Sequence, residues 1–172
     1  MTHIIFEPVK NNLPPVMTIY DPACGSGGML TESQNFIKDE EGEIRAVNSD
    51  VYLYGKEIND ETYAICKSDM MIKGNNPENI RIGSTLSTNE FAGTTFDYML
   101  SNPPYGKSWA SELKYIKDGK DIIDPRFIVK LKDYWGNEED AEATPRSSDG
   151  QLLFLMEMVN KIAHYHQNYL EL

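Results

Sequence analysis

Short apolar runs and longer segments of helical periodicity alternate through the first hundred residues. The apolar runs have the length of strands and occupy residues 16–20, 51–55, 79–82 and 95–100. After the first two runs come segments in which apolar residues recur every three or four positions, as on one face of a helix. This alternation predicts an α/β fold, in which a parallel sheet carries helices on both faces.

Two regions depart from this pattern. Proline and asparagine at positions 8, 11, 12, 14 and 15 predict an irregular N-terminal segment over residues 1–15. Residues 106–147 show no clear periodicity and are expected to form a loop. A final helix is predicted over residues 149–167, because Ser148 and Gln151 have the spacing of a capping box. Its first half is apolar on nearly all sides, which predicts burial between layers. The ordered domain is thus expected to span residues 16–172.

Composition is that of one globular domain. The chain has 172 residues, of which 40% are hydrophobic and 25% are charged. No stretch approaches the roughly 18 consecutive apolar residues of a membrane span, and no basic-then-apolar leader opens the sequence. These features predict a cytoplasmic protein with no membrane partner. Cys24 and Cys66 are too few for a disulfide framework and are expected to be reduced, buried thiols.

The net charge of −11 argues against general affinity for nucleic acid, which depends on Lys and Arg. The charge is unevenly distributed, because residues 107–132 hold seven cations and four acids. This segment carries +3, and the rest of the chain carries −14. This local excess of positive charge has two interpretations, a contact with a phosphate backbone or a solvated loop.

A glycine cluster lies between the first predicted strand and the first predicted helix. Glycines there let the backbone approach a ligand, and the start of the helix offers free N–H donors. Glu57, at the end of the second predicted strand, can accept hydrogen bonds from both hydroxyls of a ribose. The pair predicts a nucleoside site, although a turn with a nearby surface acid is the alternative. The cluster comprises Asp21, Pro22, Ala23, Cys24, Gly25, Ser26, Gly27 and Gly28.

A second motif, Asn102-Pro103-Pro104-Tyr105, follows the fourth predicted strand. The prolines make a rigid turn in which the Pro103 carbonyl stays free as an acceptor. The Asn102 side chain adds another acceptor, and Tyr105 offers an aromatic face for stacking. Together they predict a site for a planar amino group. His164 and His166 lie two positions apart on a predicted helix and point to different sides, so no metal site is expected.

These two motifs together resemble those of the amino-methyltransferases that act on DNA adenine, and more narrowly the modification (M) subunits of type I restriction-modification systems. The resemblance extends over most of residues 18–165. It is carried by YDPACGSGGML from Tyr20, YGKEIND at 54–60, IRIGSTL at 80–86, FDYMLSNPPYGKSW at 96–109 and SSDGQLLFLMEMVNKI at 147–162.

The resemblance implies a Rossmann-like class I methyltransferase fold that uses S-adenosylmethionine. In that family the methionine end of the cofactor lies against the turn formed here by Asp21, Pro22, Ala23, Cys24, Gly25, Ser26 and Gly27. Glu57 would hold the ribose, and Ser84, which stands where the family usually has an acid, and Asn102 would complete the cofactor site. Asn102, Pro103, Pro104 and Tyr105 would bind the flipped adenine and direct its amino group to the methyl group.

The resemblance also implies partners and a longer fold. Double-stranded DNA and the specificity (S) and restriction (R) subunits are the expected partners. The family's sheet has seven strands, of which this chain supplies a partial sheet in the order 3-2-1-4. We therefore expect an incomplete catalytic domain, limited activity of the isolated chain, and self-association through the exposed edge of the fourth strand.

Two other interpretations stay open at this point. The NPPY motif also occurs in methyltransferases of glutamine side chains in proteins and of guanine in ribosomal RNA. A non-catalytic interaction module, truncated but able to dock a specificity subunit, is the alternative from a different class.

Overall fold

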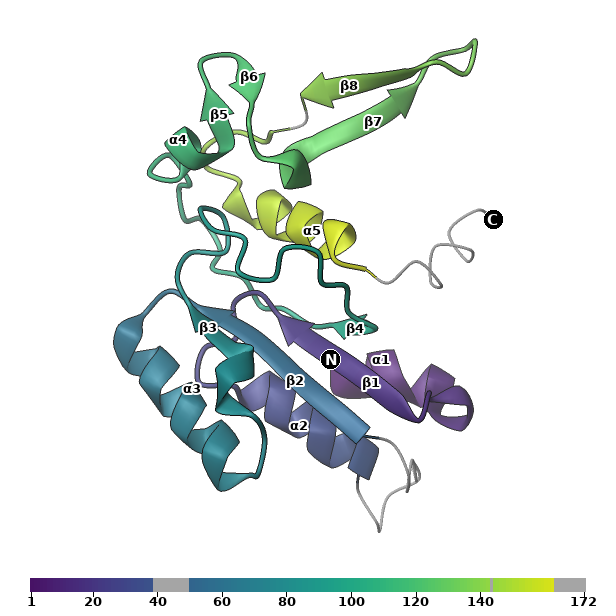
Figure 1. Cartoon of the computed structure of the whole chain (residues 1–172), viewed down its shortest axis with the longest axis vertical. Helices are drawn as coiled ribbons and strands as arrows, with labels where there is room; N and C mark the ends of the chain where they lie inside the picture. Colours follow the sequence, from purple (N-terminus) through teal and green to yellow (C-terminus); the bar gives the residue numbers. More distant parts are fainter. Residues whose placement is uncertain (39–49, 143, 163–172) are drawn as a thin grey trace.

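A four-stranded parallel sheet forms the centre of the molecule in the computed structural model, which describes residues 1–38, 50–142 and 144–162 (Figure 1). Its strands lie in the order β3 (Ile80–Ile82), β2 (Asp50–Glu57), β1 (Val16–Asp21) and β4 (Tyr98–Met99). All three pairings are parallel. The predicted order 3-2-1-4 is confirmed. A short 3-10 turn, η2 (Pro77–Asn79), leads into β3.

One face of the sheet is covered by the helices α1 (Thr2–Phe6), α2 (Gly28–Lys38) and α3 (Asp60–Ile72). Met17 and Ile19, two positions apart on β1, lie in one apolar core with Leu30 of α2 and Met70 of α3. The cap of α3 follows the sequence, because the Asn59 side chain accepts a hydrogen bond from the Thr62 N–H at the start of this helix.

The N-terminal segment is ordered, so the prediction of an irregular segment over residues 1–15 is wrong. Residues Thr2–Phe6 form α1 and Glu7–Asn12 form a 3-10 helix, η1. Pro8 lies in the first turn of η1, where a missing N–H donor costs nothing. Phe6 is completely buried and lies 5.0 Å from Tyr98 between ring centroids. Phe6 is the fully buried anchor of the segment, and Ile5 and Leu13 pack against the same core.

The other face of the sheet carries α5 (Gly150–Asn160) and an aromatic cluster. Tyr20 of β1 stacks on Phe96 with 4.5 Å between ring centroids. Helices therefore lie on both faces, as predicted. α5 is not buried between layers, because Leu152, Leu155 and Val159 are 48%, 56% and 63% exposed. Only one side of this helix faces the rest of the described chain.

The start of α5 also differs from the prediction. Asp149 occupies the N-cap position without a capping hydrogen bond from its side chain. The Ser148 hydroxyl instead contacts Asp149, and the buried Gln151 Oε1 has no partner among the described residues. Ser148 and Gln151 therefore do not form the predicted capping box. The helix ends at Asn160, before the predicted end at residue 167. Residues 163–167, with His164 and His166, lie outside the described part.

Residues 106–147 contain regular structure, contrary to the prediction of a loop. Two hairpins alternate with short helical turns and extend away from the sheet (Figure 1). The longer hairpin pairs Lys132 with Glu138 and Val129 with Ala141. In chain order the elements are α4 (Leu113–Ile116), β5 (Lys117–Asp118), β6 (Asp121–Ile122), η3 (Pro125–Phe127), β7 (Ile128–Lys132) and β8 (Glu138–Glu142).

The fourth strand is short and lies at the edge of the sheet. Just before it, Phe96 forms a parallel bridge with Ile162, and the Phe96 N–H donates to the Lys161 carbonyl at 2.8 Å. The chain after α5 thus returns to the level of β4. Self-association through this edge stays a prediction.

No helix in the described part of the chain has the length and apolar character needed to span a membrane.

Candidate functional site

The glycine turn between β1 and α2 has two different kinds of glycine. Gly27 has a φ of +87°, and a Cβ on it would lie 2.8 Å from Cys66 Sγ. This glycine is required by close packing against α3. Gly25 has a φ of +57° and nothing within 4 Å of the position of a Cβ. The turn therefore leaves open space at Gly25, where a ligand can approach the backbone.

Glu57 connects the end of β2 to this turn. Its Oε2 accepts a hydrogen bond from the Gly25 N–H at 3.0 Å, and its Oε1 accepts one from the Asn59 N–H at 2.8 Å. A carboxylate has about four lone-pair sites, so each oxygen keeps capacity for another donor. The side chain is therefore held in place and can still accept hydrogen bonds from a diol.

Asp21, at the end of β1, is a buried carboxyl with an unused oxygen. Oδ1 accepts a hydrogen bond from the Ala23 N–H at 2.9 Å, whereas the buried Oδ2 has no hydrogen-bond partner among the described residues. Burial, with a smaller contribution from the charge of Glu57, raises the pKa of Asp21 to about 6. Asp21 therefore fixes the start of the glycine turn through the Ala23 N–H, next to a cavity-lining residue.

Cys24 and Cys66 are buried and free, with 4.0 Å between their Sγ atoms. The hydrogen bond to Cys66 and burial both raise the pKa of the Cys24 thiol. Cys24 is therefore a poor nucleophile.

A cavity of about 280 Å³ lies above the carboxyl ends of the strands. In open α/β sheets this is the position where ligands bind. The cavity joins the glycine turn, the end of β2, the loop after β3, the NPPY turn and the start of α5. Its walls are Pro22, Ala23, Lys56, Glu57, Ile58, Gly83, Ser84, Thr85, Leu86, Asn102, Pro104, Lys107, Ser108, Trp109, Glu112, Gly150 and Phe154.

The cavity brings together only part of the predicted site. Six of the predicted residues line it, namely Pro22, Ala23, Glu57, Ser84, Asn102 and Pro104. Gly25 and Asp21 do not line the cavity themselves, but Gly25 donates to the wall residue Glu57 and Asp21 accepts from the wall residue Ala23. Ser26 borders a separate cavity between α2 and α3. Cys24, Gly27 and Pro103 are absent from the wall, and Tyr105 is 79% exposed.

Several wall residues were not predicted. Ile58 follows Glu57 directly, so its position beside the predicted ribose site was a usable signal. Trp109 and Phe154 come from the segment after the NPPY turn and from α5, where no local pattern marks them. Gly150 lets α5 approach this segment, because a Cβ there would lie 3.1 Å from the Lys107 carbonyl oxygen. Long-range packing, rather than a motif, builds this half of the wall.

The predicted basic segment is smaller than its sequence suggests. Arg126 is 4% exposed and pairs with Asp124 and Glu157, so it cannot meet a phosphate backbone. Two lysines pair across the longer hairpin, Lys130 with Asp140 at 3.1 Å and Lys132 with Glu138 at 3.7 Å. Three of the seven cations are thus matched with acids. The described residues contain no group of three or more His, Cys, Asp or Glu side chains that could hold a metal ion.

Comparison with known proteins gives consistent matches. The family model for N-6 DNA methylases matches residues 2–165. The MjaVII methylase subunit of a type I restriction enzyme from Methanocaldococcus jannaschii is 33% identical over 106 residues, which are 60% of this chain and 17% of that protein. The MpnII methylase subunit from Mycoplasma pneumoniae is also 33% identical over 106 residues, 56% of this chain and 18% of that protein.

A solved structure shares the fold. The methyltransferase subunit of a type I restriction-modification system from Streptococcus thermophilus superposes with a TM-score of 0.65 at 24% identity. The match covers 95% of this chain and 30% of that one. This chain therefore spans less than a third of these relatives. The family match covers nearly the whole sequence and agrees with the strand order and the two motif turns, so the chain belongs to the N-6 DNA methylase family.

Proposed function

We propose that this chain forms the cofactor-binding part of a site-specific DNA adenine-N6 methyltransferase, the modification subunit of a type I restriction-modification complex. Its cofactor would be S-adenosylmethionine, its substrate double-stranded DNA, and its partners the specificity and restriction subunits. The observation that supports this most strongly is the single cavity that borders both motif turns, with Ala23 and Glu57 on one side and Asn102 on the other.

The residues that line the cavity and its turn fit S-adenosylmethionine. Glu57 keeps acceptor capacity for the ribose hydroxyls, and the open space at Gly25 admits a ligand to the turn. Asp21, whose Oδ1 accepts a hydrogen bond from the Ala23 N–H, would fix the turn against which the amino-acid end of the ligand lies. Ser84 and Ile58 line the same cavity, where they would contact the adenine ring of the cofactor. When bound, S-adenosylmethionine supplies an electrophilic methyl group.

The NPPY turn would prepare the substrate. A flipped adenine stacks on the exposed ring of Tyr105. The Asn102 side-chain oxygen and the Pro103 carbonyl accept hydrogen bonds from the amino group, which draws the nitrogen lone pair out of conjugation with the ring. Catalysis then rests on positioning and electrostatic complementarity. No covalent enzyme intermediate is needed, in keeping with the buried Cys24 thiol.

Product analysis tests this proposal. The assembled modification enzyme that contains this sequence is incubated with duplex DNA and methyl-labelled cofactor, and the nucleosides are identified by mass spectrometry. We expect N6-methyladenine, a loss of about 100-fold or more in rate for Asn102→Ala, and retention of activity in Tyr105→Phe but not Tyr105→Ala. Label on guanine or on protein glutamine, or full activity of Asn102→Ala, would contradict the proposal.

A further inference from the structure

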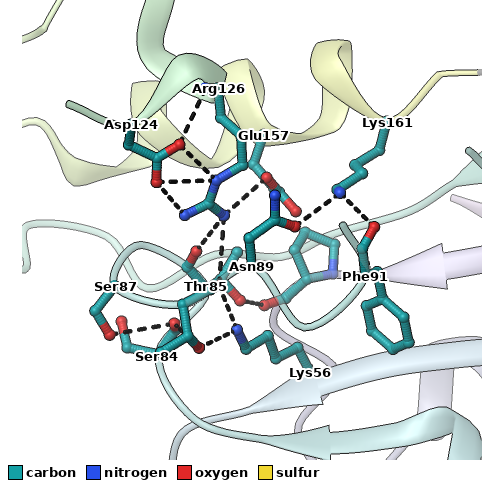
Figure 2. Close-up of polar contacts among 12 residues, drawn as sticks. Lys56, Ser84, Thr85, Ser87, Asn89, Phe91, Asp124, Arg126, Glu157 and Lys161 are labelled. Carbon is teal, nitrogen blue, oxygen red and sulfur yellow. Dashed lines mark hydrogen bonds and ion pairs between the residues drawn. The ribbon is translucent and has the colours of Figure 1, made fainter. Parts of the chain in front are cut away.

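A buried network of charged side chains adjoins one wall of the cavity, and one of its members, Lys56, is itself a wall residue (Figure 2). The network fills the space between α5 and the loop that follows β3. Arg126, Glu157, Lys56 and Lys161 are 4%, 2%, 1% and 2% exposed. No local pattern in the sequence indicates this network, because Arg126 and Glu157 are 31 positions apart.

Arg126 is the centre of this network. Its Nε and Nη2 donate to the Asp124 carboxylate at 3.0 and 2.6 Å. Its Nη1 donates to Glu157 Oε2 at 3.0 Å and to the main-chain carbonyl of Thr85 at 2.8 Å. The two carboxylates compensate the buried charge, and the planar guanidinium reaches three different segments at fixed angles. A lysine could not make all these contacts at once.

Thr85 carries this contact to the glycine turn. Its hydroxyl donates a hydrogen bond to the Pro22 carbonyl. Ser84, Thr85, Leu86 and Pro22 all line the cavity, whereas Arg126 itself does not. Hydrogen bonds therefore run from Arg126 through Thr85 to the turn that holds the proposed cofactor.

Two lysines make comparable contacts in different places. Lys56, next to Glu57, donates from Nζ to the Thr88 carbonyl and holds the same loop. Lys161, at the end of α5, donates to Asn89 Oδ1 at 2.8 Å and to the Phe91 carbonyl. Lys161 does not line the cavity, so it offers a comparison in which the network is disturbed away from the wall.

Stability alone is a weak reason for such a network, because a buried ion pair often contributes no more than apolar residues of the same volume. We propose that Arg126 is a positioning residue for S-adenosylmethionine, fixing the 84–86 wall of the cavity against the glycine turn. This inference rests on the function proposed above. It adds a determinant of cofactor affinity in the segment after the NPPY turn, outside the motifs.

Calorimetric titration of the chain with S-adenosylmethionine tests the inference. Arg126→Lys keeps the positive charge and loses the planar guanidinium with its several N–H donors. Thr85→Val removes the hydroxyl that Thr85→Ser retains. We expect Arg126→Lys and Thr85→Val each to raise Kd about 3- to 30-fold, the range of typical couplings through a network. Thr85→Ser should stay within about twofold of the unaltered chain. The double variant should be less impaired than the product of the two single effects, because both act through one relay.

Lys161→Met is the control that distinguishes an effect on cofactor binding from an effect on folding stability. We expect it to lower the midpoint of thermal unfolding while Kd stays within about twofold, and all titrations are run well below the lowest midpoint. Unchanged Kd in Arg126→Lys, or an equal rise in Lys161→Met, would overturn the inference. If Arg126→Lys does not fold, equal Kd values for Thr85→Val and Thr85→Ser overturn it. Failure of the unaltered chain to bind would instead overturn the proposed function, and this inference with it.

Discussion

Asp21 is a carboxyl whose ionised form is poorly stabilised by the protein around it. Burial raises its pKa to about 6, although the Ala23 N–H and the Ser101 hydroxyl both act to lower it. The unfolded chain ionises this group near pH 3.8. Between these two values the folded state holds the proton more tightly than the unfolded state does, so stability falls as the pH rises.

This pH dependence can be measured against Asp21→Asn, which does not titrate. Relative to that variant, the unaltered chain should lose about 2 kcal/mol of unfolding free energy between pH 4 and pH 6.5, at up to about 1.4 kcal/mol for each pH unit between the two pKa values. Urea unfolding of both proteins across this range measures the difference. Parallel stability curves would show that the folded protein stabilises the ionised carboxyl after all.

Two neighbouring glycines give a second prediction. A Cβ at Gly27 would lie 2.8 Å from Cys66 Sγ and 2.9 Å from Met70 Cε, at a φ of +87°. A Cβ at Gly28, the first residue of α2, would have no other atom within 4 Å. Gly27→Ala should cost about 1–3 kcal/mol of unfolding free energy, whereas Gly28→Ala should change it by about 0.5 kcal/mol or less. Denaturant unfolding checks both, and equal effects would contradict the packing role of Gly27.

At the scale of elements, α1 is anchored by Phe6, its one fully buried side chain. Phe6→Ala should destabilise the protein by about 3–5 kcal/mol, because Phe6 is completely buried in the core beneath the sheet. Ile4 is 77% exposed on the same helix, so Ile4→Ala should have little effect. Thermal or urea unfolding distinguishes the two variants. A small effect of Phe6→Ala would mean that the N-terminal helix does not contribute to the core.

The elements that the sequence predicts well are those with strong local signals. The apolar runs of β1 and β2 and the Asn59 cap of α3 determine their elements almost alone. β8 could not be predicted this way, because its sequence EEDAE is typical of exposed coil or helix. It becomes a strand by pairing with β7 through a turn in which Asp133 accepts the N–H of Trp135 and of Asn137, both at 2.8 Å.

The candidate site also has a part that the sequence predicts and a part that it does not. Glu57 and the glycine turn could be found because a strand end and a turn are local features. Trp109, Phe154 and the Arg126 network could not, since distant segments meet only after folding. Arg126 shows most clearly what the sequence alone does not reveal. In the sequence it adds to the charge of a positive segment, whereas in the fold it is buried and paired with two carboxylates.

At the scale of the whole molecule, the net charge of −11 makes each lysine near the NPPY turn important for any contact with DNA. We expect Lys114, Lys117 and Lys120 to contribute, because they lie together in α4 and the shorter hairpin, soon after that turn. Replacing these three by Ala should weaken binding of duplex DNA. The slope of log K against log salt should become shallower by about 0.9 for each phosphate that the protein no longer neutralises.

Fluorescence anisotropy over a salt series measures this effect. The double variant Lys130→Ala, Lys132→Ala is the comparison, since both lysines lie on the longer hairpin, further along the chain from the NPPY turn. We expect a smaller change in its salt slope. Equal slopes for the triple variant and the unaltered protein would favour a solvated segment without a role in DNA binding.

The proposed function depends above all on binding of S-adenosylmethionine in the cavity beside Glu57, and calorimetric titration of the chain measures this most directly. Glu57→Gln puts an amide donor against the N–H of Gly25 or Asn59 and removes charge beside the proposed ribose site. Glu61→Gln, an exposed acid in the first turn of α3, is the matched control. We expect saturable binding that weakens about 10- to 100-fold in Glu57→Gln and is unchanged in Glu61→Gln. Absence of binding by the unaltered chain, or equal affinity of Glu57→Gln, would contradict the proposed cofactor site.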